Sequence, residues 1–137
     1  MYVLDASVIL KWFLEEEDSS VALRLRQYYI SGASKLALPD LILYEVGNAL
    51  RYDKKFSRSA ASEAILSLVD LGIDIIVPTV SLIEGALKVA YENKVTVYDA
   101  VYVSLAQEMS YNLITADTKL YGKVKNLGCV KLLKDLL

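Results

Sequence analysis

Four acidic residues interrupt segments of the chain that are otherwise apolar or small. They are Asp5, Glu45, Asp99 and Asp117. A carboxylate in such surroundings is unfavourable unless a cation, a helix N-terminus or a proton compensates its charge. A hard divalent cation such as Mg²⁺ or Mn²⁺ binds carboxylate and water oxygens and needs neither histidine nor cysteine. The pattern therefore indicates a site for Mg²⁺ or Mn²⁺, provided that the four side chains converge in space.

The places of these acids along the chain favour such convergence. Asp5 directly follows an apolar strand expected over residues 2–4, and Asp117 follows a strand expected over residues 112–115. Parallel strands expose their carboxyl ends at one edge of the sheet, where ligand sites form. Glu45 interrupts a helix face that is otherwise apolar at i, i+3 and i+4 spacing. A glutamate on the inward face of a helix suggests a function rather than solvation.

Each acid also has a purely structural interpretation. Asp5, Asp99 and Asp117 could each cap a helix, because Asp is among the favoured N-cap residues. Glu45 would point to solvent if the true helix were shifted by a residue or two. The sequence leaves both interpretations open for each acid taken singly.

Composition excludes several kinds of enzyme. The 137 residues contain no histidine, so a Ser-His-Asp triad, a Cys-His dyad and a histidine zinc site are all excluded. The net charge of −2 provides no global basic field, so any binding of nucleic acid must come from a local basic patch. With 55% hydrophobic residues, one cysteine and no apolar run of about 20 residues, we expect a cytoplasmic protein that forms oligomers.

Strands alternate with helices along the whole chain, which predicts one α/β domain. Strands are expected at residues 2–4, 35–38, 73–77, 112–115 and 129–130. Helices are expected at residues 5–13, 21–29, 40–55, 57–70, 80–91, 98–109 and 117–124. This order predicts a central, mostly parallel sheet that is covered by helices on both faces.

Four motifs resemble a known family. The stretches YVLDASVILKWF, EVGNAL, YDAVYVSLA and TADTKL, in this order and spacing, are similar to those of PIN domains, specifically the VapC toxins of type II toxin–antitoxin systems. The resemblance covers essentially all of residues 1–137. It implies a single three-layer α/β/α domain and a Mg²⁺- or Mn²⁺-dependent endoribonuclease that hydrolyses RNA phosphodiester bonds with a metal-activated water.

The resemblance also implies roles for individual residues. The acidic quartet of the family falls on Asp5, Glu45, Asp99 and Asp117, with Asp5 and Asp99 as direct metal ligands and the other two completing the shell or holding water. Supporting roles fall on Ser7, Asn48 and Thr115. Some members carry a further acid shortly after the last aspartate, where this chain has Thr118 and Lys119, which leaves a second metal open.

Partners follow from the resemblance and from the local charge. The family implies a homodimer and a cognate antitoxin of the VapB kind. For the RNA backbone, a basic cluster follows the Glu45 helix, and one further lysine follows Ser7; these residues are Lys11, Arg51, Lys54, Lys55 and Arg58. If that helix continues to residue 55, three of these cations share one face. Alternatively, they are solvated cations favoured by the helix dipole.

Other functions remain to be compared. A phosphotransfer receiver or a haloacid-dehalogenase-like hydrolase also places aspartates at strand ends, but the second needs an acid two residues after the first, where this chain has Ser7. A PIN domain that only binds RNA or a protein is the remaining alternative. Because loss of one or more acids would mark that state and all four are present, catalysis is favoured.

Overall fold

A five-stranded parallel sheet forms the centre of the computed structural model, which describes residues 1–136. The strand order is β3-β2-β1-β4-β5, and every neighbouring pair is parallel. The strands are β1 (Tyr2–Leu4), β2 (Leu36–Pro39), β3 (Asp74–Ile76), β4 (Asn112–Thr115) and β5 (Val130–Leu132). The expected parallel α/β architecture is thereby confirmed.

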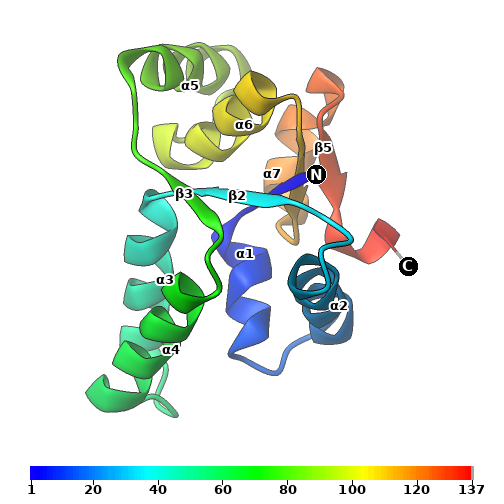
Figure 1. The fold of residues 1–137 in the computed structure, drawn as a ribbon. Coiled ribbons are helices and arrows are strands. Elements are labelled where there is room, and N and C mark those ends of the chain that lie inside the picture. Colours follow the sequence, from blue (N-terminus) through cyan, green and yellow to red (C-terminus); the bar gives the residue numbers. More distant parts are fainter. Residues whose placement is uncertain (137) are drawn as a thin grey trace.

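Helices cover both faces of this sheet. Figure 1 shows α5 and α6 together on one face and α1 to α4 on the other, while α7 packs against β4 and β5. The helices are α1 (Ala6–Ile9), α2 (Ser19–Ile30), α3 (Leu41–Tyr52), α4 (Arg58–Asp70), α5 (Val80–Asn93), α6 (Val97–Met109) and α7 (Thr118–Val124). Short 3₁₀ turns are η1 (Leu10–Trp12), η2 (Lys125–Leu127) and η3 (Leu133–Leu136). None of the helices within residues 1–136 has the length and apolarity that a membrane crossing requires.

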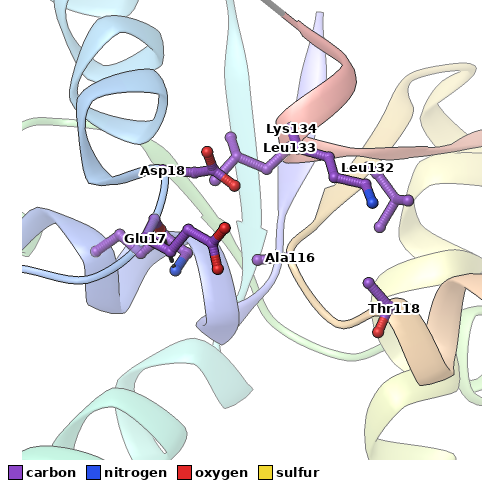
Figure 2. A pocket seen from close by; sticks show the side chains of 8 residues that line it. Glu17, Asp18, Ala116, Thr118, Leu132, Leu133 and Lys134 are labelled. Carbon is purple, nitrogen blue, oxygen red and sulfur yellow. Dashed lines mark hydrogen bonds between the residues drawn. The ribbon is translucent and has the colours of Figure 1, made fainter.

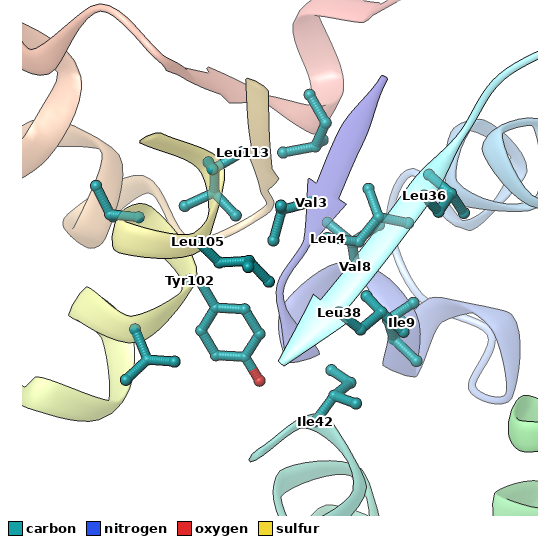
Figure 3. Close-up of a cluster of buried hydrophobic side chains, with 14 of the residues drawn as sticks. Val3, Leu4, Val8, Ile9, Leu36, Leu38, Ile42, Tyr102, Leu105 and Leu113 are labelled. Atoms are coloured by element: carbon teal, nitrogen blue, oxygen red, sulfur yellow. The ribbon is translucent and has the colours of Figure 1, made fainter. Parts of the chain in front are cut away.

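The core lies between the sheet and its two helical layers. All four residues of β2 are buried, as expected for a parallel strand that is covered on both faces. In α6 the seven residues from Ala100 to Ala106 are all buried, because this helix lies between α5 and strands β1, β2 and β4. Figure 3 shows Tyr102 of α6 packed among the apolar side chains of the core, near the ends of β1 and β2. This packing fixes α6, and with it Asp99, against the sheet.

Helix α3 is shorter than the sequence predicts. It ends at Tyr52 and not at Lys55, because Asp53 takes an extended conformation and its carboxylate accepts the backbone N–H of Lys55 over 2.8 Å. Such a side-chain-to-backbone bond competes with continued helix formation. The prediction that Arg51 shares a helix face with Lys54 and Lys55 is therefore wrong.

The helix expected at residues 5–13 is also shorter and irregular. Only Ala6–Ile9 is α-helical, and the chain continues as the 3₁₀ turn η1. The N-cap of α6 is Thr96, so Asp99 is the third residue of that helix and not its cap. The sequence offers either Ser57 or Ser59 as the cap of α4, and the Ser57 hydroxyl takes this role by accepting the backbone N–H of Ala60 over 3.1 Å. Thus the sequence places the elements well and their ends less well.

Candidate active site at the carboxyl ends of the strands

Asp5 and Asp117 both follow central strands at the same edge of the sheet. Leu4 is paired with Ile114, so β1 and β4 end side by side. The backbone N–H of Asp5 then donates to the carbonyl of Ile114 over 3.3 Å. The fold therefore brings the first and the last of the four acids to one edge, as the alternation of strands and helices predicts.

Asp5 is a buried carboxylate with several hydrogen bonds. Its side chain is 6% exposed, and one carboxylate oxygen accepts the Ser7 hydroxyl over 2.5 Å and the backbone N–H of Val8 over 3.3 Å. Burial raises the pKa of Asp5 to about 6, against the lowering effect of hydrogen bonds from Ser7, Thr115 and Val8, and the charge of Asp99 adds to the rise. Asp5 caps α1 and is also a costly buried acid, so the capping interpretation is correct without being sufficient.

Ser7 and Thr115 join the two strand ends. The Ser7 hydroxyl accepts the backbone N–H of Ala116 over 2.8 Å while it donates to Asp5. The Thr115 hydroxyl lies 3.4 Å from the Ser7 hydroxyl and accepts the backbone N–H of Asp117 over 3.0 Å. These contacts hold the loop after β4 against the start of α1.

Glu45 is fixed by a residue that the sequence analysis did not single out. The hydroxyl of Tyr102, a residue only 1% exposed, donates to the Glu45 carboxylate over 2.5 Å and so ties α6 to α3. Burial raises the pKa of Glu45, the Tyr102 hydrogen bond opposes this, and Asp99 adds to it. Burial and Glu45 together raise the pKa of Tyr102, which stays protonated as the donor. Its position one turn after Asp99 is the only signal of this role in the sequence.

Asp99 lies where the electrostatic effects of the other acids meet. Burial raises its pKa most, the charge of Asp117 raises it further, and Thr96 and Lys123 lower it. In turn, the charge of Asp99 raises the pKa values of both Asp5 and Glu45. The four acids therefore form one electrostatically coupled group, although within residues 1–136 no three acidic or cysteine side chains are grouped closely enough to hold an ion by themselves.

A hollow rich in lysine opens on one side of Asp99. We call it the lysine hollow; it has a volume of about 190 Å³ and includes Asp99, Asp117, Lys94, Lys119 and Lys123 in its lining. The ammonium group of Lys123 donates to the carbonyl of Lys94 over 3.2 Å and so connects α7 to the loop before α6. These three lysines carry no clear sequence signal of a shared site, although Lys119 and Lys123 follow Asp117 and are spaced i, i+4 from each other.

A second hollow, rich in tyrosine, opens on the other side of Asp99. We call it the tyrosine hollow; it has a volume of about 360 Å³. Its lining includes Tyr44, Glu45, Asn48, Thr96, Tyr98 and Asp99. The predicted supporting residue Asn48 is therefore an exposed neighbour of Glu45 and Asp99 in one cavity.

A third hollow borders the end of β4 and is lined by both signs of charge. Its volume is about 170 Å³, and Figure 2 shows Glu17, Asp18, Thr118 and Lys134 around Ala116. Lys11 also lines it, but its ammonium group donates to the carbonyl of Glu17 over 2.7 Å. Lys11 thus shares a hollow with Ala116 and Thr118, the two neighbours of Asp117 in the chain, and one of its donors is already used.

The remaining predicted RNA contacts lie apart from these hollows. None of Arg51, Lys54, Lys55 and Arg58 lines any of the three cavities described above in residues 1–136. The Arg51 guanidinium lies 5.2 Å from the ring centre of Tyr52. Contact of this basic cluster with RNA stays a prediction.

Comparisons with known proteins identify the family. The family model of the PIN domain matches residues 2–126. Ribonuclease VapC3 of Pyrobaculum aerophilum is 34% identical over 125 residues, which are 88% of this chain and 92% of the relative. Exonuclease VapC9 of the same organism is 32% identical over 111 residues, or 79% of this chain and 84% of the relative. A toxin–antitoxin complex from Klebsiella pneumoniae contains a chain of the same fold, with a TM-score of 0.74 and 18% identity over 97% of this chain and 98% of that one. The chain therefore belongs to the PIN-domain family, in the branch of the VapC ribonucleases.

Proposed function

We propose that this chain is the toxin of a VapBC-type module and cuts RNA internally. Mg²⁺ or Mn²⁺ is held by the carboxylate cluster, the name used here for Asp5, Glu45, Asp99 and Asp117. The observation that carries the proposal is the position of the four acids around the carboxyl ends of β1 and β4: Asp5 and Asp117 follow these two strands, and Asp99 shares one hollow with Asp117 and another with Glu45. Membership of the PIN-domain family and similarity to a relative named as a ribonuclease support it. The second relative is named an exonuclease, so internal cutting needs its own test.

The donor set fits a hard divalent cation. Carboxylate oxygens are the ligands that Mg²⁺ and Mn²⁺ prefer, and Mg²⁺ usually keeps several waters, which suits a site with few direct protein ligands. We assign direct contacts to Asp5 and Asp99, and contacts through water to Glu45 and Asp117. Asp5 is only 6% exposed and this burial raises its pKa, so a cation beside it would favour the charged form. When bound, the cation lowers the pKa of water and neutralises charge that develops at phosphorus.

The surrounding residues of the chain hold this arrangement in place. Ser7 fixes the orientation of the Asp5 carboxylate, and Tyr102 does the same for Glu45. Lys119 and Lys123 provide positive charge beside Asp99 and Asp117, where it attracts the phosphates of an RNA strand. Rigid support of this kind keeps acids in position despite their mutual repulsion.

The same proposal includes partners and a location. We infer a homodimer, a VapB-type antitoxin that inhibits the nuclease, and a cytoplasmic site of action where RNA is available. The Klebsiella chain of the same fold is part of a toxin–antitoxin complex, which supports the antitoxin partner by similarity of fold.

The test compares wild type with Asp99→Asn on linear and circular single-stranded RNA in the presence of Mn²⁺ or Mg²⁺. We expect wild type to cut both forms and Asp99→Asn to be slower by about 100-fold or more, because the loss of a ligand removes several kcal/mol of transition-state stabilisation. Asp70→Asn, at the exposed end of α4, is the matched control and should cut normally. Cutting of linear RNA alone would refute internal cleavage, and equal rates for wild type and Asp99→Asn would refute the site.

A further inference from the structure

Two of the side chains that line the tyrosine hollow are exposed tyrosines. Tyr44 is 75% exposed and Tyr98 is 65% exposed, so neither ring contributes much to the core. Tyr44 comes from α3 and Tyr98 from the first turn of α6, and both line the cavity that contains Glu45 and Asp99. Two exposed aromatic rings beside a proposed catalytic centre provide a surface for a flat, partly apolar group.

Charge separates this hollow from the one on the other side of Asp99. No Lys or Arg among the described residues lines the tyrosine hollow, whereas Lys94, Lys119 and Lys123 all line the lysine hollow. Phosphates are attracted to the lysines, while an uncharged ring system fits a cavity without cations. The volume of about 360 Å³ lies within the usual range of small-ligand sites, roughly 300–1,000 Å³.

Asn48 adds a polar group suited to recognition. Its amide offers both hydrogen-bond donors and an acceptor, and it is exposed in the same hollow, one turn after Tyr44 on α3. The edge of a nucleobase presents this same combination of donors and acceptors. An aromatic surface with a single amide is a common way to bind an unstacked base.

We propose that the tyrosine hollow binds a single unstacked nucleobase of the RNA, next to the bond that is cut, with Tyr44 and Tyr98 as stacking residues and Asn48 as the residue that reads the base edge. This inference rests on the proposed function. The proposal also predicts the path of the RNA strand. Its phosphate backbone runs from the lysine hollow past Asp99, and the base of the following nucleotide enters the tyrosine hollow. The enzyme therefore requires single-stranded RNA at the cut, because a paired base cannot enter.

The test measures kcat/KM on a short single-stranded RNA and on the same RNA with an abasic ribose at either nucleotide flanking the mapped cut. On normal RNA, Tyr44→Ala and Tyr98→Ala should each lower kcat/KM by roughly tenfold, as loss of one base-stacking contact does. Tyr44→Phe and Tyr98→Phe should keep most activity. Tyr91→Ala is the matched control, because this side chain of α5 is exposed and lines none of the hollows near Asp99. With one abasic position, wild type should become as slow as the alanine variants, which should lose nothing more.

Each other outcome has a definite meaning. The proposal is overturned if the alanine variants cut normal RNA as fast as wild type. It is also overturned if their kcat/KM falls below that of wild type by the same factor on normal and on abasic RNA. Variants that keep full cutting but resist inhibition by an antitoxin would assign the hollow to a protein segment, which also overturns it. Failure of the proposed function is separate, because wild type itself would then not cut the normal RNA.

Discussion

The carboxylate cluster has a fixed half and an open half, and the two halves differ in what holds them. In the fixed half, Asp5 and Glu45 each accept a hydroxyl hydrogen bond of 2.5 Å, from Ser7 and Tyr102. In the open half, Asp99 is half-buried and Asp117 is exposed, and both line the lysine hollow. In the fixed half, packing and hydrogen bonds determine the position and protonation of the acids. In the open half, solvent and nearby lysines moderate their charge.

This difference predicts that substitutions in the two halves have different effects. Changes in the fixed half should alter stability, pH dependence and metal binding, because buried charges interact strongly with their surroundings. Changes among the exposed lysines beside the open half should be modest and sensitive to salt. The predictions that follow test this division, beginning with the largest effect.

The largest effect should come from comparing Asp5, which caps α1, with Asp117, which caps α7 by accepting the backbone N–H of Leu120 over 3.0 Å. Asp5→Asn should lower RNA cleavage by about 1,000-fold, because it removes a direct ligand and several kcal/mol of transition-state stabilisation. Asp117→Asn, whose proposed contact is through water, should lower cleavage by roughly 10–100-fold. Single-turnover rates at saturating Mn²⁺ check both values. Equal losses for the two variants would contradict the assignment of a direct contact to Asp5 and a contact through water to Asp117.

The next effect concerns the stability of the metal-free protein against pH. The pKa of Asp5 rises from 3.8 when unfolded to about 6 when folded, so the folded state binds more protons between these values. Stability from this group is therefore fully present below pH 3.8 and is lost as pH rises through 6, by at most about 3 kcal/mol. Asp5→Asn lacks this loss, so its stability relative to wild type should increase from pH 4 to pH 7.

Urea unfolding in EDTA checks this change across that pH range. Added Mn²⁺ should then stabilise wild type more as pH rises, because binding needs the ionised carboxylate, and should not stabilise Asp5→Asn comparably. Parallel pH profiles for wild type and variant in EDTA would show that Asp5 titrates normally.

A third effect concerns the packing of α5 on α6, the helix that carries both Asp99 and Tyr102. A Cβ atom on Gly85 of α5 would lie 2.5 Å from the Ser104 hydroxyl of α6, which is buried and donates to the Leu82 carbonyl over 2.8 Å. Gly85→Ala should therefore destabilise the protein by about 1–3 kcal/mol through overpacking. Gly122→Ala is the control in α7, where a Cβ meets nothing within 4 Å and the helix should gain slightly. Thermal unfolding distinguishes them, and equal shifts would contradict the close packing of α5 on α6.

The sequence predicted the fold from strong, local signals. Buried parallel strands such as β2 are continuous apolar runs, and alternation with helices fixes a parallel sheet. The end of α3 was mispredicted because Asp53 forms a specific bond to the backbone of Lys55, which hydrophobic periodicity does not register. Element ends depend on such single contacts, whereas element types depend on many residues together.

Some residues of the candidate site could be predicted from the local sequence, and others could not. The four acids could be identified because a charge on an apolar segment is unusual within its own neighbourhood. Tyr102 could not, since a tyrosine in a buried helix resembles any core residue until α3 places Glu45 at its hydroxyl. Lys94 acquires its place only when α7 approaches the loop before α6. Roles that depend on contacts between distant segments need the folded structure.

A smaller effect should follow from removing the hydroxyl of Tyr102. Tyr102→Phe should destabilise the protein by about 1 kcal/mol at neutral pH, because one hydrogen bond to a charged group is lost. The pKa of Glu45 should rise further, since this bond now lowers it. Carbon-13 NMR titration of the Glu45 carboxyl checks the direction. Tyr91→Phe, at an exposed ring of α5 outside the hollow that contains Glu45, is the control, and an unchanged Glu45 pKa in Tyr102→Phe would show that the bond does not hold the carboxylate.

The smallest effect should come from the open half. Lys123 is exposed, lowers the pKa of Asp99 and borders the lysine hollow. Lys123→Ala should raise the KM for RNA only about two- to fivefold at low ionic strength, and the difference should vanish at high salt because exposed charges are screened. Lys88→Ala on α5, which is exposed but lines neither hollow beside Asp99, should leave KM unchanged. A larger effect that persists at high salt would mean that Lys123 binds RNA in a desolvated contact, and the lysine hollow would then belong with the fixed half.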